Sequence, residues 1–202
     1  MATLVKANYR HAQHGGRQAA VHAVNYYAHR QDMHGDQAQR MGFSREVQGL
    51  DTQAMRDLVE QADGDYYYRM VLSPGASRDT AVDLQDWTRD LLLELETDHG
   101  EFPYVAVEHR DQTDYAHVHV VMVLEKKLDR DDLDALRETG THLYELKREW
   151  YEPTLTQTQE RDVQPSRDFS EVLEGYVAGY QDDPDLEPQR RKRHRNISLE
   201  KQ

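Results

Sequence analysis

Hydrophobic residues recur along this chain with two spacings, one typical of strands and one typical of helices. Strands are predicted over residues 3–9, 66–73, 105–109 and 118–124. Helices are predicted over residues 18–30, 51–62, 78–98, 129–138, 141–152 and 168–180. The segment 118–124 is apolar apart from His119, which is typical of a strand buried on both faces. This order of elements predicts an α+β fold, with helices packed on a central, mostly antiparallel sheet.

Residues that interrupt regular structure set the expected boundaries. Asp51 is predicted to cap the helix that follows it, and Gly140 to separate two helices. Residues 31–49 are predicted to form a loop, because they are polar and rich in Gly, Gln and Arg. Arg40 and Arg45 in this loop could contact phosphate, although a solvated loop explains them better.

Length and composition bound the organisation of the chain. Its 202 residues include no cysteine, which excludes disulfides and thiolate metal sites. We expect one domain over residues 1–152, a linker and amphipathic helix over 153–180, and a disordered tail over 181–202 that is acidic and then basic. We recognise no signal peptide and no run long enough to span a membrane, so we expect a soluble, cytoplasmic protein without membrane insertion.

The net charge of −13 at pH 7 argues against a nucleic-acid partner, since proteins that bind polyphosphates usually carry a basic field. Two features weaken this objection. Arginine, the better bidentate phosphate ligand, outnumbers lysine. The acidic residues also concentrate in segments 79–98, 129–138 and 181–187, away from the histidines described next. The basic run at 190–195 could in addition hold a DNA backbone non-specifically.

Three histidines gather around the predicted strands 105–109 and 118–124. His117 and His119 are two residues apart, so a strand points both side chains to one face. The seven residues after His109 suffice for a hairpin loop, which brings His109 beside the other two. A single histidine on a strand is usually structural, but burying several in one patch is costly unless they are bonded. Three neutral imidazoles therefore predict a divalent metal site.

Short motifs in this chain resemble those of plasmid relaxases, the mobilisation nucleases of the His-hydrophobic-His (HUH) endonuclease superfamily. His109-x-Asp111, followed by five residues and His117-Val118-His119, resembles the third motif of these enzymes. Ser73-Pro74-Gly75 at the end of a predicted strand resembles the second motif, although the same tripeptide is an ordinary turn. The resemblance covers about residues 1–152 through three motifs in the family's order.

The first motif carries the tyrosine that attacks DNA, and Asn25-Tyr26-Tyr27 resembles it because it lies in a helix after the first strand. Helical phase separates the two tyrosines. Tyr27 shares an apolar face with residues 20, 24 and 28, so we expect it to be packed, with its hydroxyl remote from the metal. Tyr26 falls on the polar side, near His22 and His29. Tyr26 is therefore the expected nucleophile and Tyr27 the alternative.

The resemblance implies a HUH-type fold and a metal-dependent enzyme that nicks and rejoins single-stranded DNA at a plasmid transfer origin. Tyr26 would form a covalent phosphotyrosine intermediate, and the three histidines would bind one divalent metal. That metal would be magnesium or manganese in the cell, with manganese, nickel or zinc suitable in vitro. Asp111 would orient a metal-bound histidine, unless it only caps the hairpin turn. Ser73 and Arg30 would contact DNA, and accessory relaxosome proteins would be further partners.

Two other functions stay open. Replication initiators and transposases of the same superfamily usually carry the tyrosine on a helix after the histidine pair, where this chain offers Tyr144 and Tyr151. A non-catalytic metal-binding or structural domain would suit the acidic charge better than either nuclease. The order of the motifs, with the tyrosine first and the histidines later, favours the relaxase.

Overall fold

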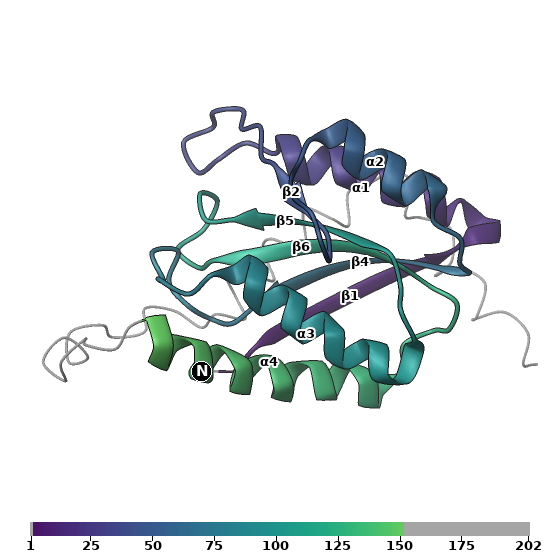
Figure 1. The fold of residues 1–202 in the computed structure, drawn as a ribbon. Coiled ribbons are helices and arrows are strands. Elements are labelled where there is room, and N and C mark those ends of the chain that lie inside the picture. Colours follow the sequence, from purple (N-terminus) through teal and green to yellow (C-terminus); the bar gives the residue numbers. More distant parts are fainter. Residues whose placement is uncertain (1, 152–202) are drawn as a thin grey trace, which may run out of the picture. The chain divides into compact units, whose positions relative to one another are not determined.

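The structure is a computed structural model that describes residues 2–151 (Figure 1). These residues form a six-stranded antiparallel sheet and four α-helices, which confirms the predicted α+β class. The strands are β1 (Leu4–His11), β2 (Gly42–Phe43), β3 (Gln48–Leu50), β4 (Tyr66–Ser73), β5 (Tyr104–His109) and β6 (His117–Leu124). The helices are α1 (Gly16–His29), α2 (Thr52–Gln61), α3 (Leu84–His99) and α4 (Arg130–Tyr151), and a short 3-10 turn spans Ala12–His14.

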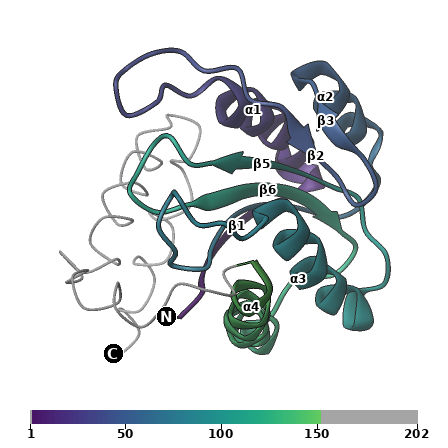
Figure 2. The ribbon, with the colours of Figure 1, turned by 60° about the vertical axis from the view of Figure 1, so that its left-hand side comes forward.

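The sheet separates two layers of helices. Helices α1 and α2 cover one face, and α3 and α4 cover the other, as two views show (Figures 1 and 2). The strand order is β1-β4-β6-β5-β2-β3, so the β5–β6 hairpin lies inside the sheet. Every residue of β6 is buried, which confirms the prediction of a strand covered on both faces.

The main apolar core lies between the sheet and the α3/α4 layer. The predicted helical spacing places four α3 residues in this core, namely Leu84, Trp87, Leu91 and Leu95. They share one buried cluster with Val120 of β6 and with residues of α4. The side chains on the opposite face of β6, which include His117 and His119, point toward the α1/α2 layer.

The helix predicted over 78–98 begins later, at Leu84. The Asp83 carboxylate accepts hydrogen bonds from the backbone N–H groups of Gln85 and Asp86, at 2.8 and 3.0 Å. These N–H groups have no partner within a helix, so a capping aspartate fixes the start of the helix just after itself. Residues 78–83 are instead irregular, and Ala81 is exposed.

Gly140 does not separate two helices, because α4 continues through it to Tyr151. The indole Nε1 of Trp87 donates to the Gly140 carbonyl oxygen at 2.9 Å, across the α3/α4 interface. A Cβ at position 140 would lie 2.8 Å from Cγ2 of Thr3 and 3.3 Å from Cδ2 of Leu91. The glycine therefore permits a close approach of α4, which offsets a helix-propensity cost of about 1 kcal/mol relative to alanine.

Other expectations have mixed outcomes. The strand predicted over 66–73 matches β4, and Asp51 caps α2 by accepting from the Ala54 N–H at 2.7 Å. The loop predicted over 31–49 contains β2 and β3, which are too short to carry a hydrophobic pattern. The segments 153–180 and 181–202 lie outside the described residues. Among residues 2–151, no helix is long and apolar enough to cross a membrane.

Candidate metal centre

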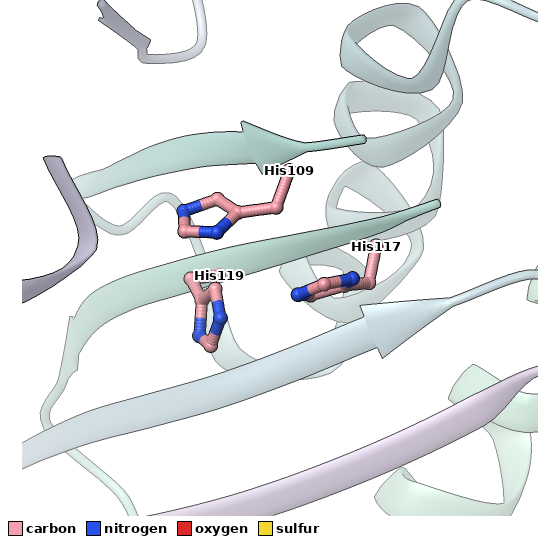
Figure 3. Close-up of side chains that lie close together, drawn as sticks. All are labelled: His109, His117 and His119. Atoms are coloured by element: carbon pink, nitrogen blue, oxygen red, sulfur yellow. The ribbon is translucent and has the colours of Figure 1, made fainter. Parts of the chain in front are cut away.

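The β5–β6 hairpin brings the three predicted histidines together (Figure 3). His109, the last residue of β5, pairs directly with His117, the first residue of β6, and His119 follows on the same face. The ring centroids are 4.7–5.3 Å apart, and one nitrogen of each ring lies within 4.8 Å of the others. Among residues 2–151, this is the one group of three or more His, Cys, Asp or Glu side chains close enough to hold one ion.

Burial keeps these imidazoles uncharged. All three side chains are almost completely shielded from solvent. Burial lowers the pKa of His109 and His119 well below the ordinary value of 6.5, and the neighbouring imidazoles lower it further. Burial likewise lowers the pKa of His117 to about 4. At neutral pH each ring therefore keeps a lone pair, which is the form that binds a divalent metal.

A backbone contact sets the tautomer of His117. Its Nδ1 lies 3.1 Å from the Tyr115 carbonyl oxygen, which also accepts a hydrogen bond from the Thr113 hydroxyl at 2.7 Å. A carbonyl oxygen only accepts, so Nδ1 must carry the proton and Nε2 the lone pair. Such a bond on the second nitrogen is the usual way in which a protein orients a metal-binding histidine. The donor set therefore fits a divalent metal that accepts imidazole.

Tyr27 is the tyrosine that packs against the histidines. Its ring stacks on the His119 ring, with centroids 4.1 Å apart and planes inclined by 23°. The prediction that Tyr27 is packed is confirmed, since it is 2% exposed. Its ring lies directly beside the histidines, whereas the expectation that its hydroxyl lies remote from the metal stays a prediction. Helical phase identified the apolar face of α1 correctly, but this face lies against the side of the sheet that carries the histidines. The sequence therefore makes Tyr27 the alternative nucleophile and not the expected one, since helical phase does not show which face of the sheet a helix covers.

Tyr26 occupies the outer side of α1. It is 44% exposed, and its ring meets the Tyr27 ring edge-on with centroids 6.1 Å apart. The guanidinium carbon of Arg30 lies 5.3 Å from the centre of the Tyr26 ring. Together with His29, these residues line a shallow opening at the end of α1. The expected DNA contact Arg30 is thus beside Tyr26, and both residues can be reached from solvent.

Asp111 forms a hydrogen-bonded ion pair with Arg40, which the sequence placed in a solvated loop. Both carboxylate oxygens accept from Arg40, Oδ1 from Nε at 3.2 Å and Oδ2 from Nη2 at 2.6 Å. These bonds go to Arg40 and not to a histidine, so the role of Asp111 in orienting a metal-bound histidine stays a prediction. Its negative charge still acts on the cluster, because it opposes the burial effect by raising the pKa of His117.

Ser73, the other expected DNA contact, is completely buried. Its hydroxyl donates to the Ala116 carbonyl oxygen at 2.8 Å and accepts from the Gly75 N–H at 3.3 Å. These bonds tie the end of β4 to the residue before His117. A role of Ser73 in holding the histidine strand in place is therefore visible, whereas its contact with DNA stays a prediction.

Arg110 is a residue near the site that the sequence did not single out. Its guanidinium donates to three backbone carbonyl oxygens of the irregular segment before α3, those of Arg78, Thr80 and Val82, at 3.1, 2.6 and 2.9 Å. It also forms an ion pair with Glu108. Arg110 therefore fixes the 78–82 segment beside the β5–β6 loop. Nothing in the sequence pattern indicates this contact, because carbonyl acceptors can come from any residue.

Tyr144, an alternative nucleophile, lies in the core on the other side of the sheet. It is buried in the α3/α4 layer, and its hydroxyl and the Thr80 hydroxyl are hydrogen-bonded at 2.8 Å. The sheet stands between this position and the Tyr27–His119 stack. Tyr151 is the last described residue of α4. The placement of Tyr144 counts against a replication-initiator arrangement that uses this tyrosine.

No family model, curated protein or solved structure matches this chain. The relaxase interpretation therefore depends on the short motifs and on the geometry around the histidines.

Proposed function

We propose that this protein is a metal-dependent nuclease of the HUH type, which nicks and rejoins single-stranded DNA at a plasmid transfer origin through a phosphotyrosine. One observation carries the proposal: Tyr27 of α1 stacks on His119, one of three buried histidines at the loop end of the central β5–β6 hairpin. The order of tyrosine first and histidines later agrees with the relaxase motifs.

The three histidines are the groups that would hold the metal. When bound, the metal supplies positive charge that neutralises and polarises the scissile phosphate. Three protein ligands leave coordination positions for phosphate oxygens, as catalytic sites require. Imidazole ligands favour manganese, nickel or zinc over magnesium in vitro.

Tyr27 is the better placed nucleophile, because its ring touches His119 whereas Tyr26 points to solvent. The phenolic oxygen of Tyr27 forms a bond to phosphorus while the bond from phosphorus to the 3′ oxygen breaks. The phenol loses its proton and the 3′ oxygen gains one, which leaves a 5′-phosphotyrosine and a free 3′ hydroxyl. Because one phosphodiester replaces another, the 3′ hydroxyl can attack in return and rejoin the strand.

The charge distribution is compatible with a DNA substrate. The acidic helices α3 and α4 cover the face of the sheet opposite the histidines (Figure 2). The segments around the site carry arginines and carboxylates in similar number, with Arg30, Arg40, Arg78 and Arg110 beside Asp32, Asp79, Glu108 and Asp111. The objection raised by a net charge of −13 is therefore weaker at the site than for the whole chain.

The burial of the histidines and Tyr27 favours a second candidate, a metal site that only stabilises the fold. Structural sites are closed, whereas a nuclease must admit a phosphate. For the nuclease, the segment between α1 and β2 or the end of α1 has to move when DNA binds. The two candidates differ in one observable, which is a covalent bond between DNA and protein.

The decisive experiment uses single-stranded oligonucleotides that tile the DNA on either side of the coding sequence, incubated with the protein and Mn²⁺. We expect one oligonucleotide to give a covalent adduct that chelation prevents. Tyr27→Phe should abolish this adduct, because it removes the attacking oxygen and almost no volume, while Tyr26→Phe should retain it. Mass spectrometry of the nucleotide-bearing peptide identifies the residue: Tyr26 there would restore the assignment made from sequence. Tight metal binding without any adduct would instead favour the structural site.

A further inference from the structure

Arg40 connects the two parts of the molecule that form the candidate site. Its backbone N–H donates to the Ala28 carbonyl oxygen at 2.9 Å, and its Nη1 donates to the Arg30 carbonyl oxygen at 2.7 Å. Ala28 lies in the last turn of α1, the helix that carries Tyr27, and Arg30 is the extended residue that follows the helix as its C-cap. The Nε and Nη2 groups bind the Asp111 carboxylate, two residues beyond His109. One side chain thus touches the tyrosine helix and the histidine hairpin.

The surroundings of Arg40 restrict the movement of its side chain. Its side chain is 9% exposed, and three of its N–H groups point at acceptors fixed in two different elements. The planar guanidinium binds a carboxylate through two hydrogen bonds, so it fixes the orientation of the two groups as well as the distance between them. Two further hydrogen bonds join the segment after α1 to the β5–β6 loop. The Met33 N–H donates to the Asp111 carbonyl oxygen at 2.8 Å, and Gln112 Nε2 donates to the Gln31 carbonyl oxygen at 3.3 Å.

The position of Arg40 also satisfies the end of α1. The last carbonyl groups of a helix lack partners within the helix and carry partial negative charge. The Arg40 backbone N–H supplies a donor to one of them, the Ala28 carbonyl, and its side chain supplies a donor to the carbonyl of the C-cap residue Arg30. The positive charge of Arg40 stabilises the same helix end. Substitution of Arg40 keeps the backbone bond to Ala28 but removes the side-chain bonds to the Arg30 carbonyl and to Asp111, which leaves the end of α1 freer to shift relative to the hairpin. Tyr27 lies on the last turn of α1, so a shift there moves its ring relative to His119.

We propose that Arg40 is a positioning residue, which holds Tyr27 in register with the three histidines through its bonds to the end of α1 and to Asp111. This inference rests on the proposed function for its effect on rate, but not for its effect on geometry. Asp111 then serves the reaction through Arg40. A displacement of about 1 Å between reacting groups can cost on the order of 10²-fold in rate, so a loss of this size is expected without Arg40.

The test compares Arg40→Ala and Arg40→Lys with the control Arg45→Ala in the full-length chain. Lysine keeps the positive charge but cannot reach both Asp111 oxygens and the Arg30 carbonyl at once. Arg45 joins the β2–β3 turn to α3 through an ion pair with Glu96, and so offers a similar bond away from the histidines. The geometric readout is the NMR shift of the His119 ring protons in metal-free protein, which the stacked Tyr27 ring displaces upfield.

We expect Arg40→Ala to lose much of this upfield displacement, Arg40→Lys to lose part of it and Arg45→Ala to keep it. In single-turnover adduct formation, Arg40→Ala should be slower by about 10²-fold, with DNA and Mn²⁺ affinities changed by no more than about threefold. An unchanged His119 shift in both Arg40 variants overturns the proposal, and so does an unchanged or faster adduct rate. If wild-type protein forms no adduct with any oligonucleotide, the nuclease function fails, and the His119 shift alone then decides the role of Arg40.

Discussion

The two faces of the sheet are buried in different ways. The face toward α3 and α4 is an apolar core, in which residues such as Trp87, Leu91 and Val120 pack together. The face toward α1 and α2 buries polar groups beside apolar ones, including the three histidines and Arg69. Strand β6 contributes to both, with His117 and His119 on one face and Val118 and Val120 on the other. The apolar core and the candidate metal site therefore lie on opposite faces of one strand.

The difference has an energetic meaning. Burying a polar group without full compensation costs free energy, and a metal-free histidine cluster is such a group. The apolar face offsets this cost, because each large side chain removed from water there contributes about 1.5–3 kcal/mol. A protein can keep a site that lowers its folding stability only where the sequence and packing of the rest of the structure favour the same fold. Changes on the α3/α4 face should accordingly alter folding, and changes on the α1/α2 face should alter binding.

The largest expected effect is on the apolar face. Trp87→Ala should lower the free energy of unfolding by about 3–5 kcal/mol, because it leaves a cavity and removes the bond to the Gly140 carbonyl. Chemical denaturation measures this loss. Leu93→Ala is the matched control on the same helix: Leu93 is 59% exposed, so its replacement should change stability by less than about 0.5 kcal/mol. Equal effects of both changes would contradict the assignment of the core.

The second prediction concerns metal binding on the polar face. At a free Mn²⁺ or Zn²⁺ concentration one hundred times the Kd, wild-type protein should be stabilised by about 2.7 kcal/mol against unfolding. His119→Ala should lose this stabilisation while the metal-free protein keeps its fold, since the removed group was costly to bury. Thermal unfolding with and without metal, together with calorimetry, provides the measurement. Unchanged metal affinity in the triple alanine variant of His109, His117 and His119 would exclude the site.

Acid should destabilise the metal-free protein through the same face. The folded-state pKa of His117 is about 4, below the unfolded value of 6.5, so the unfolded chain takes up protons first as the pH falls. Its contribution to stability is thus fully present above pH 6.5 and is lost between pH 6.5 and about 4. His117→Asn keeps a donor for the Tyr115 carbonyl but cannot titrate, and should have a shallower pH dependence of the unfolding free energy. Identical pH profiles would show that His117 is not buried uncharged.

The sequence predicted the features that depend on local pattern. Alternation placed His117 and His119 on one face, and a hairpin of ordinary length brought His109 to them. The contacts of Tyr27 and Arg40 were not predictable in this way. Periodicity shows that Tyr27 is on the buried side of its helix, but not which face of the sheet the helix covers. Arg40 and Asp111 are 71 residues apart in sequence, and neither has a pattern that indicates the other.

The smallest predicted effect tests why Gly140 is tolerated inside α4. Gly140→Ala should gain about 1 kcal/mol from helix propensity, but its Cβ would meet Thr3 Cγ2 at 2.8 Å, and such overpacking costs about 1–3 kcal/mol. We therefore expect a net loss of about 1 kcal/mol in otherwise wild-type protein. Thr3→Ala removes the nearest obstacle, so Gly140→Ala in that background should be neutral or stabilising by up to about 1 kcal/mol. Denaturant unfolding of the four proteins gives the coupling between the two positions. A loss of the same size in both backgrounds would show that Leu91, rather than Thr3, sets the limit on the approach of α4.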